Sequence, residues 1–219
     1  MATIRVFYTK TMRAKYISHL DTMRTVTRAL RRSRLPLWYT EGFNPHMYIT
    51  FALPLSLGYE GLRESFDVRL TREMDLALAA KRMRAVMPTG FEIVSAAPPV
   101  MEPREIAWAD YEVRFLFNKD DGVRAKAAFE SFDGQPSIDV VKRTKKGDKQ
   151  IDIRPFTQVL SSSWGQEGAA LTLRMAAGIS LNINPTLYLK AFYSWAKLEP
   201  EGVRVVRTAI LNAGLESFR

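Results

Sequence analysis

Two histidines and one aspartate near the start of the chain are the residues whose types best suit acid–base chemistry. The sequence has only two histidines, His19 and His46, and Asp21 lies two residues after the first. Because imidazole titrates near neutral pH, the two histidines and the carboxylate could act together as acid and base on a phosphodiester, or they could bind a metal. Neither spacing matches a metal motif such as His-Glu-x-x-His. We therefore take His19, Asp21 and His46 as candidate catalytic residues, and we expect no metal and no cofactor.

The start of a helix explains the same residues without any chemistry. Ser18 is a favourable N-cap, and Asp21 three residues later lies near the positive end of the helix dipole. The arrangement is close to a capping box, in which Glu or Gln usually takes the position of Asp21. On this interpretation His19 packs at the edge of the core. The sequence alone leaves both interpretations open.

The helix that begins here carries a row of arginines. At 100° per residue, Met23, Val26 and Leu30 share one arc with His19. Four arginines lie on a nearly opposite arc: Arg24, Arg28, Arg31 and Arg32. Because a guanidinium binds phosphate or carboxylate through two parallel hydrogen bonds, the row predicts a phosphate-binding face. A merely solvated surface is the alternative.

A loop with turn-forming residues follows the helix. Gly42 and Asn44 favour turns, so Phe43 and His46 lie on a loop between the helix and the next strand. Aromatic side chains beside cations stack the bases of single-stranded nucleic acid. Trp38, Phe43, Asn44 and His46 therefore join the four arginines as candidate nucleic-acid-binding residues. We expect only one or two of the four aromatic residues from 38 to 48 to be exposed, because aromatics at strand ends usually belong to the core.

Charge and composition narrow the classes of function. The chain of 219 residues has a net charge of +9, and residues 1–58 carry nine Lys or Arg against Asp21 and Glu41, a net of +7. A local basic excess attracts nucleic acid, an anionic cofactor or an acidic protein face, unless it serves only solubility. The absence of cysteine excludes disulfides and a self-contained iron–sulfur cluster. No signal peptide or membrane-spanning stretch is evident, so we expect a cytoplasmic protein that does not enter a membrane.

The elements that must position these residues follow the same order twice. Sequence periodicity first predicts strands at 2–9, 47–53, 64–70 and 91–96, with helices at 18–34 and 73–87. It then predicts strands at 110–117, 137–143, 169–176 and 203–211, with helices at 121–132 and 185–196. The order β-α-β-β-α-β forms a ferredoxin-like sandwich. We therefore predict an α+β fold of two tandem ferredoxin-like sandwiches with antiparallel sheets.

A proline-rich segment separates the two predicted domains. Residues 97–103 contain three prolines and resemble a stiff linker. We assign 1–98 to an N-terminal domain with the basic helix and the loop, and 104–219 to a C-terminal domain. An insertion at 144–165 interrupts the second domain, and its basic start and apolar end predict a turn that returns to a short strand or helix. The duplication is inferred from element order alone.

Several short segments carry a resemblance to a known family. They are Tyr16-Ile17-Ser18-His19-Leu20-Asp21, Arg28-Ala29-Leu30-Arg31-Arg32, Gly42-Phe43-Asn44-Pro45-His46, Phe51-Ala52-Leu53-Pro54-Leu55 and Gly58, and later Pro88-x-Gly90, Lys149-Gln150-Ile151-Asp152-Ile153-Arg154-Pro155 and Val206-Arg207-Thr208. Together they resemble the radical-SAM-linked protein family, a bacterial domain family without established activity. Met47 and Tyr48 depart from its pattern, which has a proline and a basic residue there.

The resemblance implies an accessory role beside a radical S-adenosylmethionine (radical SAM) enzyme. Members of the family occur as separate chains or fused to such enzymes, and some lie near genes for RNA processing. The iron–sulfur cluster would belong to the partner, because this chain has no cysteine. We predict a module without activity of its own that binds or presents an RNA or protein substrate through the basic edge of the N-terminal domain. The alternatives are an RNA-processing or RNA-modifying enzyme using His19, His46 and Asp21, and a subunit that docks on a radical SAM enzyme.

Overall fold

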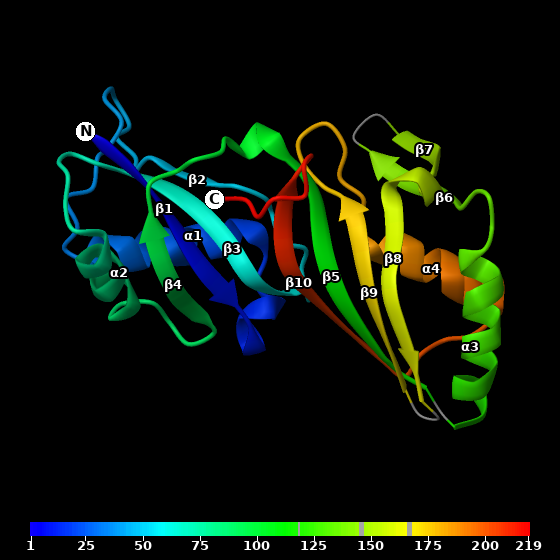
Figure 1. Ribbon diagram of the computed structural model, residues 1–219. Coiled ribbons are helices and arrows are strands. Elements are labelled where there is room, and N and C mark those ends of the chain that lie inside the picture. The colour runs from blue at the N-terminus through cyan, green and yellow to red at the C-terminus, as the bar shows by residue number, and fades with distance from the viewer. Residues whose placement is uncertain (118, 145–146, 166–167) are drawn as a thin grey trace. The chain divides into compact units, whose positions relative to one another are not determined.

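The chain folds into two compact units of mixed α and β structure. The computed structural model describes residues 1–117, 119–144, 147–165 and 168–219 (Figure 1). Unit 1 comprises residues 1–105 and 216–219, and unit 2 comprises residues 106–215. The predicted α+β class is confirmed. The last four residues belong to unit 1, although the sequence assigned them to the second half.

Unit 1 combines an antiparallel sheet with the helices α1 (His19–Arg32) and α2 (Leu76–Arg84). Its strands are β1 (Ala2–Lys10), β2 (Ile49–Phe51), β3 (Glu60–Leu70) and β4 (Phe91–Ala97). The short 3-10 helices are η1 (Met12–Tyr16) and η2 (Pro103–Glu105). β1 lies between β4 and β3, and β2 pairs with β3 on the side of β3 away from β1.

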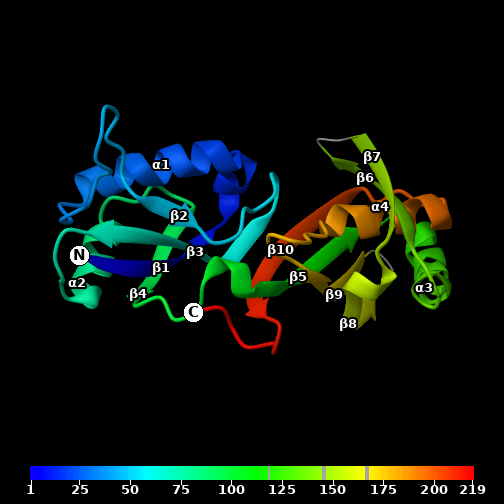
Figure 2. The ribbon, with the colours of Figure 1, turned by 90° about the horizontal axis from the view of Figure 1, so that it is seen from above.

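The helices cover one face of the unit 1 sheet. Val6 of β1 and Val68 of β3 share a buried apolar cluster with Leu30 of α1 and Met83 of α2. Since successive strand residues point to opposite faces, Arg5 and its neighbours in phase point away from the helices. We call this second side the helix-free face. Figure 2 shows α1 on one side of β1 and β3.

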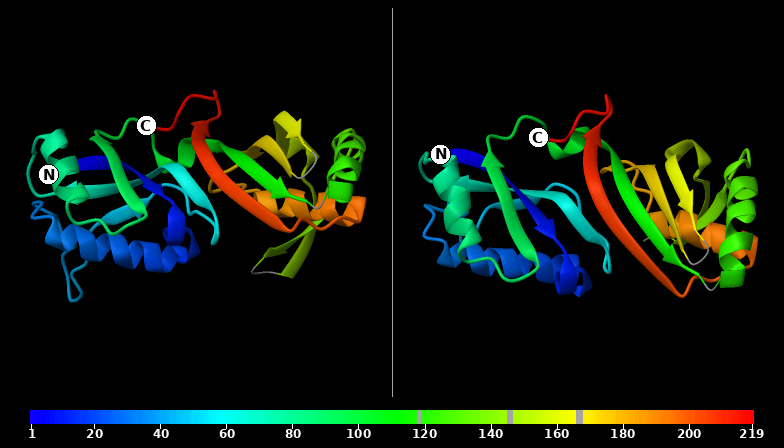
Figure 3. Two further views of the ribbon diagram at one scale, coloured as in Figure 1. Left: turned by 90° about the horizontal axis from the view of Figure 1, so that it is seen from below. Right: turned by 60° about the horizontal axis from the view of Figure 1, so that its bottom comes forward.

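Unit 2 contains four antiparallel sheet strands and a separate hairpin. Its elements are β5 (Ile106–Leu116), α3 (Lys119–Asp133), β6 (Asp139–Thr144), β7 (Gly147–Asp152), η3 (Arg154–Phe156), β8 (Thr157–Trp164), β9 (Gly168–Ala176), α4 (Pro185–Ala196) and β10 (Gly202–Asn212). The sheet order within the unit is β10-β5-β9-β8, with antiparallel neighbours, whereas β6 pairs with β7 alone (Figure 3).

The hairpin changes the predicted role of one strand. The strand predicted at 137–143 forms as β6, but it lies outside the main sheet, where β8 takes the edge position beside β9. Pairing β6 with β7 closes a loop of only a few residues and therefore loses less chain entropy than pairing with the more distant β9. The predicted insertion at 144–165 thus contains β7, η3 and β8, whereas the sequence predicted only a turn and a short strand or helix there.

A buried guanidinium joins distant parts of unit 1. Arg5 is 1% exposed, and its Nε and Nη2 donate to the two carboxylate oxygens of its cross-strand partner Asp67, each at 2.7 Å. Its Nη1 donates to the carbonyl oxygens of Met101 at 2.8 Å and Arg219 at 3.0 Å. The guanidinium carbon lies 4.2 Å from the centre of the Phe218 ring. One side chain thus connects two strands, the proline-rich segment and residues 216–219.

Unit 2 contains a similar pair, but there the aspartate lies on the first strand of the unit and the arginine on a later one. Arg174 of β9 donates from Nε and Nη2 to the carboxylate of Asp110 on β5, at 2.7 and 2.8 Å. The hydrogen bonds to Asp110 raise the pKa of Arg174 above its ordinary value. The charged form of the guanidinium is thus favoured beside the carboxylate, and the pair holds the two central strands in register.

Replacing Arg5 by alanine should lower the free energy of unfolding of unit 1 by about 3 kcal/mol, because the mostly buried Asp67 carboxylate would lose its partner. Hydrogen exchange of the β1 and β3 amides, followed by mass spectrometry, measures the stability of unit 1 separately from that of unit 2. Arg104→Ala is the matched control, since Arg104 pairs with Glu102 at the surface, where their side chains are 75% and 65% exposed. An exposed pair contributes under about 1 kcal/mol, so equal losses in the two variants would contradict the prediction.

Candidate functional site

The two histidines lie at opposite ends of α1. His19 is the first residue of α1, and its ring meets the ring of Phe51 edge-on at 5.5 Å. His46 precedes Phe51 by five residues on the extended segment that enters β2. Such a segment spans about 16 Å at about 3.3 Å per residue. In Figure 2 the loop before β2 leaves from the end of α1 that is remote from η1. The structure therefore does not bring His19 and His46 together.

His46 closes the loop that presents Phe43. Its backbone N–H donates to Thr40 Oγ1 at 3.1 Å, and its Nδ1 lies 3.0 Å from the same oxygen and 3.3 Å from the carbonyl oxygen of Asn44. Gly42 has a φ of +116°, a backbone conformation that favours glycine. Phe43 is fully exposed at the tip. The imidazole of His46 thus has a structural role in fixing the shape of this loop.

Asp21 takes part in the cap of α1, as the helix-start interpretation predicts. Its backbone N–H donates to Ser18 Oγ at 3.1 Å, and that hydroxyl donates to Asp21 Oδ2 at 2.8 Å. Arg24 Nη1 donates to Asp21 Oδ1 at 3.1 Å. The hydrogen bonds from Ser18 and then Arg24 lower the pKa of Asp21. A carboxylate with a lowered pKa and two donors is a weak proton acceptor, which argues against a role as general base.

The arginine face of α1 is exposed, as its periodicity predicts. Arg24 pairs with Asp21, and Arg32 Nη2 donates to the carbonyl oxygen of Val86 at 3.1 Å. Within the part of the chain that the structure describes, Arg28 and Arg31 have no hydrogen bond or ion pair. These two guanidinium groups are therefore available to an anion from outside unit 1.

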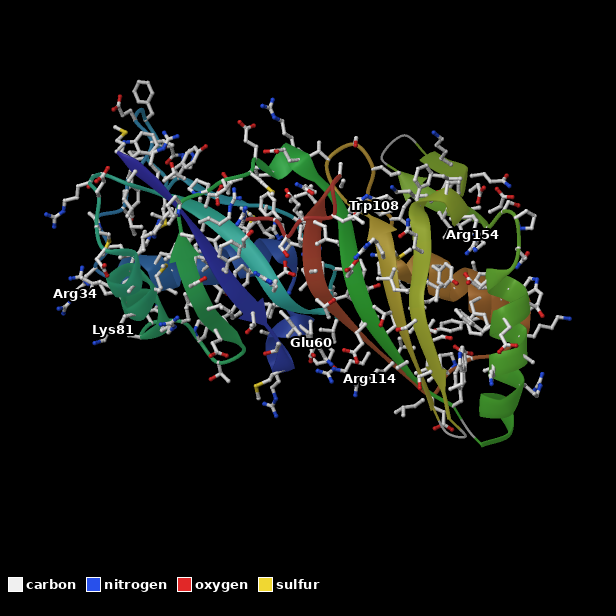
Figure 4. All side chains as sticks on the ribbon, in the orientation of Figure 1. Arg34, Glu60, Lys81, Trp108, Arg114 and Arg154 are labelled. Carbon is white, nitrogen blue, oxygen red and sulfur yellow. The ribbon has the colours of Figure 1, made fainter. Side chains whose placement is uncertain are left out.

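Basic side chains gather where α1 and α2 end. This helix-end cluster consists of Arg28, Arg31, Arg32, Arg34, Lys81 and Arg82. Arg82 Nη1 donates to the carbonyl oxygen of Arg34 at 2.9 Å, which joins the two helix ends. Figure 4 shows Arg34 and Lys81 projecting outward at the same end of unit 1. Cations near helix C-termini interact favourably with the helix dipole, so part of this charge also stabilises the helices.

The aromatic residues around the loop fall into two pairs. Tyr39 and Phe43 are exposed, whereas Trp38 and Tyr48 are half-buried. The guanidinium of Arg69 lies over both of the half-buried rings, 4.9 Å from the centre of Trp38 and 4.2 Å from the centre of Tyr48. Arg69 could not be predicted from the sequence, because one arginine in an alternating strand looks like any other residue of a polar face. Only the fold brings it to the aromatic pair.

Exposed apolar side chains lie at the opposite end of α1. This apolar patch consists of Met12, Tyr16, Leu20 and Leu57, which are 63%, 67%, 54% and 63% exposed. The backbone N–H of Gly58 donates to the carbonyl oxygen of Lys15 at 2.8 Å, which holds the loop containing Leu57 against η1. Such a group of exposed apolar residues is typical of an interaction surface. Its residues come from three separate segments, so no local pattern predicts them as a group.

Within the described ranges, no three His, Asp or Glu side chains are placed to hold a metal ion. No helix in those ranges is long and apolar enough to cross a membrane.

Fold and site together define a class: a cysteine-free α+β protein of two units, whose first unit carries a basic edge beside an exposed aromatic loop. Residues 3–185 match the family described as "Uncharacterized protein conserved in bacteria (DUF2344)". The match covers more than half of the chain, so the protein belongs to this family. Comparison with curated proteins gave no match.

The cap of α1 can be tested through the pKa of Asp21. Ser18→Ala should raise this pKa toward the ordinary value of 3.8 by more than Arg24→Ala does, because the Ser18 hydrogen bond is the larger cause of the lowering. Carbon-detected NMR titration of the carboxyl group gives both values. Since the folded-state pKa lies below 3.8, the stabilisation by ionised Asp21 is present above 3.8 and is lost as the pH falls through the folded-state pKa. A larger shift in Arg24→Ala would contradict this assignment.

Proposed function

We propose that unit 1 binds single-stranded RNA as an accessory module of a radical SAM system. The observation that carries the proposal is the exposed pair Arg28 and Arg31, which have no partner among the described residues and lie within the helix-end cluster. The exposed ring of Phe43 lies on the loop at this end of α1. Guanidinium groups that bind phosphates, together with an aromatic ring that stacks a base, form the usual combination for single strands.

The length of the arginine face favours a polymer over a small anion. Arg24 and Arg32 are eight residues apart on α1, which corresponds to about 12 Å at about 1.5 Å per residue. One phosphate group is too small to contact guanidinium groups at both ends of such a row. A chain of phosphates reaches several of them at once, and each contact releases counterions.

The radical SAM association is inferred from the family resemblance and the composition. The chain has no cysteine, so a radical enzyme in the same system would have to supply the iron–sulfur cluster. His19 and His46 lie at opposite ends of α1, which leaves the enzyme alternative without a joint acid–base pair. Presentation of RNA to a partner enzyme agrees better with these features than catalysis by the chain itself.

We also infer that the two units share the β-α-β-β-α-β plan of ferredoxin-like sandwiches. The strand order β4-β1-β3-β2 of unit 1 agrees with this plan. The order β10-β5-β9-β8 of unit 2 agrees with it if β8 has taken the edge position of β6. Each unit also joins two central strands by an Arg–Asp fork, but the charges are exchanged between the strands, so the common plan is inferred from the order of the elements.

RNA binding through the arginine face should depend steeply on salt. For a single-stranded oligonucleotide, the double variant Arg28→Ala, Arg31→Ala should lower the slope of log affinity against log salt by about 0.7 for each lost phosphate contact. Fluorescence anisotropy of labelled RNA at several salt concentrations measures this slope. Lys126→Ala, Lys190→Ala is the matched control, because it removes two exposed charges from helices of unit 2. Absence of binding by the unmodified protein at low salt would refute the proposal.

The apolar patch favours a second candidate function, docking on the partner enzyme. Leu20→Glu with Leu57→Glu should reduce recovery of an iron-containing partner from extracts of the source cell at least tenfold, because two carboxylates would have to be buried in the interface. Iron and sulfide analysis of the recovered fraction gives the measurement. Ile179→Glu is the control, since Ile179 is 81% exposed in unit 2. Unchanged recovery of an iron–sulfur partner by the double variant would exclude the patch as the docking surface.

A further inference from the structure

The helix-free face of unit 1 carries an arginine framed by two aromatic residues. Arg69 lies directly between the buried residues Val68 and Leu70 in β3, so its side chain leaves the sheet on the face opposite to α1 and α2. The backbone N–H of Trp38 donates to the carbonyl oxygen of Arg69 at 2.9 Å, and the N–H of Arg69 donates to the carbonyl oxygen of Tyr48 at 3.3 Å. The two aromatic residues are therefore fixed beside Arg69 by the backbone.

The three side chains form a compact group. The rings of Trp38 and Tyr48 are 6.0 Å apart at an interplanar angle of 64°, and the Arg69 guanidinium lies 4.9 and 4.2 Å from their centres. Cation–π attraction to two rings restricts the arginine to few conformations. A guanidinium held in this way loses little additional entropy when it binds a ligand.

Arg69 differs from Arg5, which lies on the same face, in what its side-chain N–H groups contact. Arg5 donates to a carboxylate and two carbonyl oxygens, as described above. Arg69 is also partly buried, yet no acceptor for its side-chain N–H groups exists among the residues that the structure describes. The side-chain nitrogens of Arg69 keep contact with solvent, since none of them is among the fully buried polar atoms that lack a partner. A guanidinium that two rings hold in place and whose N–H groups are open to solvent is well placed to donate to an acceptor supplied by a ligand.

We propose that Arg69 binds a phosphate of the RNA strand, while a neighbouring base stacks on the accessible surface of Trp38 and Tyr48. This inference rests on the proposed RNA function and extends it from the arginine face of α1 to the helix-free face. A guanidinium edge matches the oxygens of a phosphate through two parallel hydrogen bonds. The aromatic rings need an unstacked base, so the site selects single strands over duplexes. The ligand class is thus an unpaired ribonucleotide segment within a longer strand.

The test compares a single-stranded oligonucleotide with its duplex in binding to the full chain. Arg69→Ala should weaken single-strand binding about tenfold or more, because the bidentate phosphate contact is lost and the Trp38 and Tyr48 rings lose the cation that packs on them, and should change duplex affinity less than threefold. Arg69→Lys keeps the charge but loses the planar fork. It should therefore retain the salt slope of the unmodified protein while binding single strands about as weakly as Arg69→Ala. Arg63→Ala is the matched control, since Arg63 is an exposed arginine of the same strand.

Each outcome has a separate meaning. If the unmodified protein binds no RNA, the proposed function fails and takes this inference with it. If RNA binds through Arg28 and Arg31 but Arg69→Ala and Arg69→Lys bind single strands normally, the inference alone is wrong. If inorganic phosphate displaces the labelled oligonucleotide from the site at concentrations as low as those of the unlabelled oligonucleotide, the assignment to RNA is overturned. An unchanged circular dichroism spectrum of Arg69→Lys shows that loss of binding is not loss of the fold.

Discussion

The bidentate pair of Arg5 and Asp67 is the interaction on which the rest of unit 1 depends. A charge that is 1% exposed is tolerated only because a carboxylate, two carbonyl oxygens and the Phe218 ring surround it. These partners come from three places in the sequence, so the guanidinium fixes them relative to one another. Because β3 is held by this pair, the segment that pairs with β3 has a defined position. The loop with Phe43 and the aromatic pair beside Arg69 both belong to that segment.

Helix α1 separates two kinds of surface. Its C-terminal end, together with the end of α2, carries the helix-end cluster, whereas its N-terminal end lies beside the apolar patch. Attraction of a polyanion acts over about 10 Å at moderate salt, but burial of apolar side chains requires direct contact. With these features at the two ends of one helix, the proposed RNA ligand and the proposed partner enzyme would not compete for the same surface. The separation of His19 from His46 follows from the same geometry.

Much of this organisation could be predicted from local patterns. The capping residues Ser18 and Asp21 and the exposed arginine row follow from side-chain chemistry and helical periodicity, and the structure agrees with both. Contacts between residues far apart in sequence could not be predicted in this way. Arg5 and Asp67 are 62 residues apart, and nothing in either strand indicates that they face each other. Arg69 was overlooked for the same reason, and β8 was overlooked because its competitor β6 has an equally good strand pattern but a nearer partner in β7.

The order of segments along the chain also bears on how unit 1 is made. Residues 216–219 belong to unit 1 but are synthesised after all of unit 2, and they supply Arg5 with the carbonyl oxygen of Arg219 and the ring of Phe218. A ribosome adds residues one at a time, so unit 1 emerges first but lacks these contacts until the last of them has been added. The unit that begins the chain is therefore completed last. Until residues 216–219 have been added, the Arg5 guanidinium lacks the carbonyl oxygen of Arg219 and the ring of Phe218, which follow unit 2 in the sequence.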